Sequence, residues 1–131
     1  MLDRIDIHLE VPSVRYQELT GTERGESSAM IRARVMAARR IQQERYKDQA
    51  HVHCNADMRS RDLTRYARLE PEAADLLKMA ITELNFSARA YDRILKVART
   101  IADLDGGPET IRTPHISEAI QYRTLDRQMW K

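Results

Sequence analysis

The stretch "SARAYDRILKVARTIADLDG", residues 87–106, decides the fold because it holds the strongest helical pattern in the chain. Ser87 is a favourable N-cap, and Gly106 with Gly107 forms a favourable helix end. Between them, apolar residues recur every three or four positions, which places their side chains on one face of an α-helix. We therefore predict a helix whose apolar face consists of Tyr91, Ile94, Leu95, Ala98, Ile101 and Ala102.

The start of this helix carries positive charge where an isolated helix does not favour it. Arg89 and Arg93 lie in the first two turns, where unpaired N–H groups and the macrodipole disfavour a cation by about 0.3–1 kcal/mol. The two arginines are also four positions apart, so they repel each other. A bound anion would reverse both effects, because amides and guanidinium groups would converge on it. We predict that Arg89 and Arg93 bind an anion; the alternative is ordinary surface ion pairing.

Further along the same helix, two more cations have acidic neighbours. Lys96 lies four positions after Asp92, and Arg99 lies four positions before Asp103. Such pairs are common on solvated helix surfaces. We therefore interpret Lys96 and Arg99 as part of a solvated face.

Four more segments have helical patterns with recognisable ends. Residues 27–47 follow Ser27 or Ser28 as N-cap, a short helix begins near Ser60, and residues 71–84 and 113–126 begin with a proline in the first turn. Asn85 is a plausible stop for the segment 71–84. The residues expected to face the core are Ile31, Val35, Ala38, Ile41, Leu63, Tyr66, Ala67, Ala74, Leu77, Ile81, Leu84, Ile116, Ala119 and Ile120.

The chain begins with a different periodicity. In "RIDIHLEVP", residues 4–12, apolar and polar residues alternate, which predicts a half-buried β-strand that ends at Pro12. The apolar side of this strand is Ile5, Ile7, Leu9 and Val11. A single strand has no partner in a helical chain, so we interpret residues 1–12 as the last strand of a sheet whose remainder is missing. Residues 13–26 are polar and contain two glycines, which indicates a linker.

Together these patterns predict a mainly α fold: a compact bundle of about four or five helices over residues 27–131, preceded by one remnant strand. The length of 131 residues suits one domain. The 22 basic and 20 acidic side chains nearly cancel, so charge alone does not predict nucleic-acid binding. The single cysteine excludes an internal disulfide, and no signal peptide or membrane-spanning run is recognisable. We expect a cytoplasmic protein without a membrane partner.

Two local clusters suggest other kinds of site. The arginines in residues 32–45 could follow a DNA backbone, with Arg39 and Arg40 as candidates, although acids flank them and no aromatic residues interleave. "HVHC", residues 51–54, suggests zinc, but a structural zinc site needs a second ligand pair and only His115 remains. We interpret the arginines as a solvated or subunit-facing surface, predict no metal site, and expect Cys54 to be a small buried side chain.

Several stretches taken together resemble the C-terminal part of the ComM/YifB-type, magnesium-chelatase-related AAA+ ATPases. The resemblance covers nearly the whole chain, and the pairing of "SARAYDRILKVARTIADL" with a downstream "HISEAIQYR" is its most specific part. Met1 stands where such proteins usually carry a leucine, which suggests an introduced start or a shortened gene. The remaining stretches that carry the resemblance are "LDRIDIHLEV", "ESSAMIRARVMAARRIQQERY" and "CNADM".

The resemblance implies roles for two arginines. Arg89 matches the sensor-2 arginine, which reaches from a lid helix to the γ-phosphate of ATP. Arg4, in "LDRIDI", matches the arginine finger that such ATPases offer to the nucleotide of a neighbouring subunit. An arginine supplied in this way stabilises charge that develops during phosphoryl transfer.

The resemblance also implies the wider function. The chain would be a helical lid that closes over ATP and Mg²⁺ bound by an AAA+ core, in a homo-oligomeric ring, expected to be hexameric, that moves on DNA. Because no G-x-x-x-x-G-K-[ST] motif occurs, we expect no ATP hydrolysis by the chain alone and no tightly bound cofactor. The alternatives are a stand-alone helical nucleic-acid-binding module and a metal-stabilised adaptor.

Overall fold

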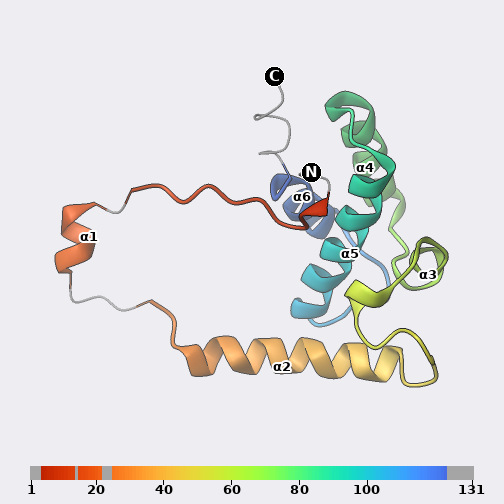
Figure 1. The fold of residues 1–131 in the computed structure, drawn as a ribbon, viewed down its shortest axis with the longest axis horizontal. Coiled ribbons are helices and arrows are strands. Elements are labelled where there is room, and N and C mark those ends of the chain that lie inside the picture. Colours follow the sequence, from red (N-terminus) through yellow and green to blue (C-terminus); the bar gives the residue numbers. More distant parts are fainter. Residues whose placement is uncertain (1–3, 14, 22–24, 124–131) are drawn as a thin grey trace.

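The structure is a computed structural model that describes residues 4–13, 15–21 and 25–123. It confirms the predicted mainly α fold (Figure 1). The predicted last helix ends at Gln121, and residues 124–126 of that prediction lie outside the described residues. The helices are α1 (Tyr16–Thr20), α2 (Ser28–Arg45), α3 (Ser60–Tyr66), α4 (Pro71–Leu84), α5 (Ala88–Leu104) and α6 (Thr113–Gln121), with a 3₁₀ turn η2 (Asn55–Asp57) between α2 and α3.

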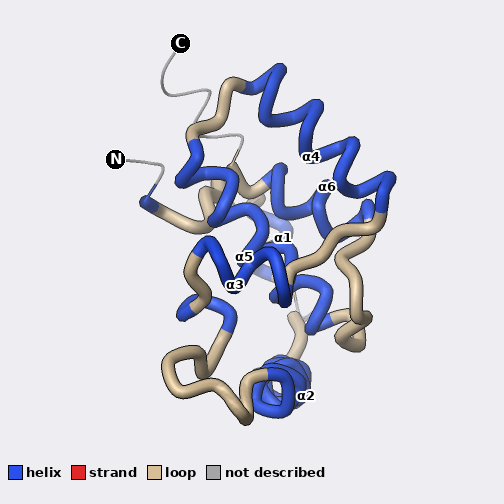
Figure 2. The backbone as a smooth tube through the Cα atoms, turned by 90° about the vertical axis from the view of Figure 1, so that its right-hand side faces the viewer, coloured by secondary structure: helices blue, strands red, loops and turns tan. Residues whose placement is uncertain are grey.

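Helix α5 lies at the centre of the bundle, as its sequence predicts. It contacts α2, α3, η2 and α6, while α4 packs mainly on α6 (Figures 1 and 2). The Ser87 side chain caps α5 by accepting a hydrogen bond from the Ala90 N–H. Most of the predicted face is buried, but Tyr91 is 40% exposed and Ile101 is only half-buried. The buried part of that face is Ile94, Leu95, Ala98 and Ala102.

Helix α4 has the predicted ends, and its buried face includes the predicted Leu77 but is shifted at other positions. Pro71 opens it and Asn85 ends it in the left-handed region, at φ 52°. Ala74 was expected to face the core and is exposed, whereas its neighbour Ala73 is fully buried. Ala73 and Ala74 are adjacent and equally apolar, so sequence alone does not show which of them begins the buried stripe. In the structure α4 packs against α6, and the residues of α4 that are buried are Ala73, Leu77 and Ala80.

Helix α2 is capped by Ser27 as predicted, but only its second half joins the bundle. Ala38 and Gln42 are buried, whereas Ile31 and Val35, expected in the core, are each 44% exposed. With 18 residues the helix is about 27 Å long, and its first half extends past the end of α5 (Figure 1). The apolar stripe of α2 is therefore longer than the surface of the bundle against which it packs.

The predicted strand at the start of the chain is not present among the described residues. Residues 5–13 form neither helix nor strand, and the His8 N–H donates to the Tyr122 carbonyl at 2.6 Å. The expected apolar side is exposed, and the one buried residue among residues 4–12 is His8, from the expected polar side. A strand needs a neighbouring strand to complete its ladder, and the described part of the chain supplies none. Within the predicted linker, α1 forms a short helix apart from the bundle (Figure 1).

Candidate anion-binding site

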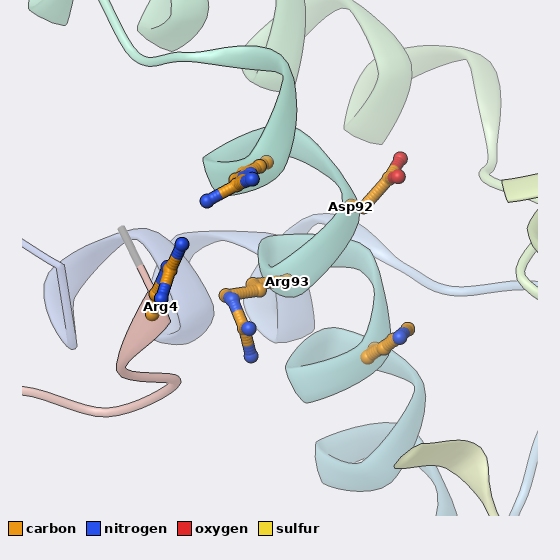
Figure 3. A pocket seen from close by; sticks show the side chains of 5 residues that line it. Arg4, Asp92 and Arg93 are labelled. Carbon is orange, nitrogen blue, oxygen red and sulfur yellow. The ribbon is translucent and has the colours of Figure 1, made fainter. Parts of the chain in front are cut away.

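One pocket brings together three residues that the sequence singled out. Its volume is about 290 Å³, and Figure 3 shows the side chains that line it. Arg93 lies on α5 facing Arg4, which comes from the other end of the chain. All the lining residues are charged: Arg4, Arg89, Asp92, Arg93 and Lys96.

Helical spacing explains the α5 side of this pocket. Arg89, Arg93 and Lys96 are separated by four and then three positions, so their side chains share one face of α5. Arg89 is the second residue of the helix, where backbone N–H groups have no partner within the helix. Positive side chains and the positive end of the helix therefore point to the same region.

Contacts with α6 explain how Arg4 reaches the pocket. The guanidinium of the buried Arg123 donates to the Ile5 carbonyl at 2.6 Å, and the His8 N–H donates to the Tyr122 carbonyl. These two bonds hold the residues that follow Arg4 against the end of α6. Sequence analysis missed Arg123, which no local pattern distinguishes from a surface arginine.

The positive charge of the pocket is only partly neutralised. Arg93 is paired with Asp6, and Lys96 donates to the Ala56 carbonyl at 3.4 Å. Arg4 and Arg89 are exposed and make no hydrogen bond or ion pair with any residue that the structure describes. The pocket thus holds guanidinium groups with unused donors, which is the arrangement that binds oxyanions.

Asp92 contributes a negative charge to the lining but does not pair with these arginines. Its carboxylate accepts a hydrogen bond from the Ser60 hydroxyl at 2.6 Å. Figure 3 shows it directed to the opposite side of α5 from Arg4. Asp92 therefore links α5 to α3 and leaves the arginine side of the pocket open.

The interpretation of Arg99 as a solvated residue is wrong. Its side chain is 1% exposed and donates to the carbonyls of Glu109, at 3.0 Å, and Tyr66, at 3.4 Å. Burial lowers the pKa of Arg99, and the nearby Arg45 lowers it further. The signal that could have found it is its spacing from Leu95, since positions four apart share a helix face.

The acid beside Arg99 is the centre of a buried polar cluster that joins α2, η2 and α5. Asp103 accepts hydrogen bonds from Arg45 at 2.9 Å and from the Asn55 side chain at 2.9 Å. Burial lowers the pKa of Arg45, but the bond and charge of Asp103 outweigh it, so the pKa is raised overall. Asn55 also accepts from the Tyr46 hydroxyl at 2.7 Å. These bonds hold the second half of α2, which contains Arg45, against the bundle.

The arginines considered for DNA lie away from the pocket. Arg39 and Arg40 are exposed on α2, do not line the pocket, and have no partner within the described ranges. Two other arginines of this helix are occupied, because Arg34 pairs with Glu26 and Arg45 with Asp103.

The cluster considered for zinc is not assembled around one point. His51 and His53 are exposed, and Cys54 is half-buried, less than we expected. His115 is buried at the start of α6, where its Nδ1 accepts a hydrogen bond from the Arg112 N–H. Across residues 4–13, 15–21 and 25–123, no three His, Cys, Asp or Glu side chains could hold a metal together. In the same residues, no helix is both long and apolar enough to cross a bilayer.

Comparison with known proteins identifies the family. Residues 25–123 match the family described as magnesium chelatase, subunit ChlI C-terminal. The chain belongs to this family. It is 42% identical over 131 residues to the competence protein ComM of Haemophilus influenzae, covering 99% of this chain and 25% of ComM. It is also 42% identical over 127 residues to the uncharacterized protein YifB of Escherichia coli, covering 96% of this chain and 24% of YifB.

The matched region is the C-terminal part of those relatives. The chain therefore spans about a quarter of the length of the curated relatives it matches. Its relation to ComM and YifB, expected from the quoted stretches, is confirmed.

Proposed function

We propose that this chain is the helical lid of a magnesium-chelatase-related AAA+ ATPase, and that Arg89 and Arg4 bind the terminal phosphate of ATP. The observation that supports this proposal is the pocket, where both arginines lie together without a partner among the described residues. Family membership is consistent with a lid, because the chain corresponds to the C-terminal part of its relatives.

The chemistry of the pocket favours phosphate over other ligands. A guanidinium presents paired N–H donors that match phosphate oxygens, and the start of a helix adds further positive potential. The five lining residues are all charged, and none is an aromatic side chain on which a nucleobase could stack. We infer that the pocket takes the phosphate end of a nucleotide and that another part of the protein binds the base.

The two arginines would act on the same phosphate group. The resemblance implies that Arg89 senses the γ-phosphate and that Arg4 serves the nucleotide of a neighbouring subunit. We propose instead that Arg4 acts beside Arg89, because the two line the same pocket. Because both line one pocket, a single phosphate can contact both. The chain has no P-loop motif, so hydrolysis would require an AAA+ core that holds ATP and Mg²⁺. In our proposal, a homo-oligomeric ring of such proteins couples lid movement to movement on DNA.

Titration with inorganic tripolyphosphate tests phosphate binding directly. At low salt, Arg89→Ala should weaken binding to the 131-residue chain at least about tenfold, because it removes charge-assisted hydrogen bonds. Arg68→Ala is the matched control, since Arg68 is also exposed but lies outside this pocket. Equal weakening in both variants, or no binding to the unmodified chain, would contradict the proposal. In a protein that includes the core, Arg89→Ala should reduce ATP turnover while the protein stays folded.

A second candidate function is nucleic-acid binding through α2. It is favoured by Arg32, Arg39 and Arg40, which are exposed along α2 and have no partner in the part of the chain described. Arg32 and Arg39 are seven positions apart, so they share a face over two helical turns. Each phosphate contact would add salt-dependent affinity.

Fluorescence anisotropy with duplex DNA at several salt concentrations tests this second candidate. The double variant Arg39→Glu/Arg40→Glu should abolish salt-dependent binding, while Arg89→Ala should retain it. Unchanged binding by the double variant would reject α2 as the nucleic-acid surface.

A further inference from the structure

We propose that Asp6 is a positioning residue of the phosphate pocket: its carboxylate holds Arg93 when the pocket is empty and gives it up when phosphate binds. This inference rests on the proposed function, because it assumes that phosphate is the ligand. It adds a residue that the sequence did not single out and that does not line the pocket itself.

The ion pair between Asp6 and Arg93 joins two distant parts of the chain at the edge of the pocket. Arg93 belongs to the same α5 face as Arg89 and lines the pocket with it. Asp6 lies two residues after Arg4, on a segment that lines a second pocket together with α5. The structure thus pairs one of the three pocket arginines with a carboxylate and leaves the other two available.

The exposure of this pair makes it easy to exchange. The side chain of Arg93 is 31% exposed and that of Asp6 is 53% exposed, so water screens their attraction. Such partly exposed pairs contribute little to stability. A phosphate carries more negative charge and more acceptor oxygens than a carboxylate, and Arg4 and Arg89 would hold it beside Arg93. The guanidinium of Arg93 would then form its stronger bonds with phosphate.

The other contacts of the segment allow this exchange without loss of Arg4. The bonds from Arg123 to the Ile5 carbonyl and from His8 to the Tyr122 carbonyl do not involve the Asp6 side chain. The segment therefore stays attached to α6 when Asp6 is released. Before phosphate binds, the Asp6 carboxylate reduces the repulsion among Arg4, Arg89 and Arg93.

A double-mutant cycle with inorganic tripolyphosphate separates this role from general electrostatics. Asp6→Asn should tighten binding to the 131-residue chain about two- to fivefold, because it removes an ion pair that competes for Arg93. In an Arg93→Gln background, Asp6→Asn should leave the affinity unchanged, because the competition no longer exists. Asp75→Asn on α4 is the matched control, since it removes one exposed carboxylate outside the pocket.

Each outcome distinguishes the two proposals. Equal tightening in both backgrounds would overturn the role of Asp6, because it would show an effect of net charge alone. Unchanged or weaker binding by Asp6→Asn would overturn it as well, while Arg89-dependent binding of tripolyphosphate would leave the proposed function standing. If the unmodified chain binds no tripolyphosphate, both proposals fall. Circular dichroism of each variant checks that the chain remains folded.

Discussion

Arg89 and Arg99 lie ten positions apart on the same helix and have opposite surroundings. Arg99 is 1% exposed, donates to the Glu109 carbonyl and forms an ion pair with Asp103. Arg89 is exposed and has no partner among the residues that the structure covers. The residue type is the same, so the difference lies in the contacts that each guanidinium makes within the chain. The N–H groups of Arg99 bind other parts of the chain and stabilise the fold, whereas those of Arg89 remain available to a ligand.

The charged residues at the two ends of α5 therefore contribute differently to the stability of the folded chain. At the C-terminal end, burial of charge is costly and is offset by the ion pairs and hydrogen bonds around Asp103. At the N-terminal end, the cations stay in water, so their cost to the folded chain is small and can be reversed by a bound anion. Two variants test this comparison directly, and a third tests an exposed carboxylate outside α5.

The largest effect is expected at the buried end. Asp103→Ala should lower the free energy of unfolding by about 3–5 kcal/mol, because it leaves the buried Arg99 and the partly buried Arg45 without their carboxylate. Urea denaturation followed by circular dichroism measures this change. Asp75→Ala, an exposed acid on α4, is the control and should change the free energy by less than about 0.5 kcal/mol. A loss below about 1 kcal/mol for Asp103→Ala would contradict the structural role of the cluster.

At the N-terminal end of α5, we expect a substitution to change the free energy of unfolding in the opposite direction. Arg89→Ala should leave the free energy of unfolding unchanged or raise it by about 0.3–1 kcal/mol, because it removes a cation from the start of α5. The same urea experiment, without phosphate in the buffer, gives the comparison. If Arg89→Ala instead destabilised the chain by more than about 1 kcal/mol, Arg89 would be a structural residue like Arg99.

The smallest effect concerns an exposed carboxylate that supports a loop. The His53 N–H donates to Asp57 at 3.0 Å, and this bond is the main reason that the pKa of Asp57 is below its ordinary value of 3.8. A lowered pKa stabilises the folded chain above that value, and the contribution is lost as pH falls through the pKa of the folded state. Asp57→Asn should therefore reduce the melting temperature slightly at pH 7, and this difference should shrink as the pH falls below 3.8.

A melting curve at several pH values checks this prediction for Asp57. A difference between Asp57→Asn and the unmodified chain that persists at the lowest pH would show that charge on Asp57 is not its cause. This result would leave the comparison between Arg89 and Arg99 unaffected.

Local signals predicted much of the helical framework. The Ser87 cap, the Pro71 start and the left-handed Asn85 end were all recognisable, because capping depends on neighbours within one turn. The same kind of local argument pointed to Arg89 as an anion ligand, and family resemblance added Arg4. Neither argument indicated that these two arginines share a pocket.

Other predictions failed because the sequence does not show which surfaces are covered by other parts of the chain. Alternation in residues 4–12 predicted a strand, but an extended segment without a neighbour forms no ladder. The stripe of α2 predicted burial for Ile31 and Val35, but the bundle ends before it reaches them. These failures have a common cause, since periodicity shows which residues share a face and does not show what lies opposite.

By itself, the sequence determined the helical class, the ends of the main helices and the family, because these depend on short-range patterns and on conspicuous shared stretches. Only the tertiary structure decided that Arg99 is buried while Arg89 is open, and that Asp6 meets Arg93 from 87 positions away. The physical reason is that burial and pairing of a charge depend on neighbours that the fold brings together from distant parts of the chain.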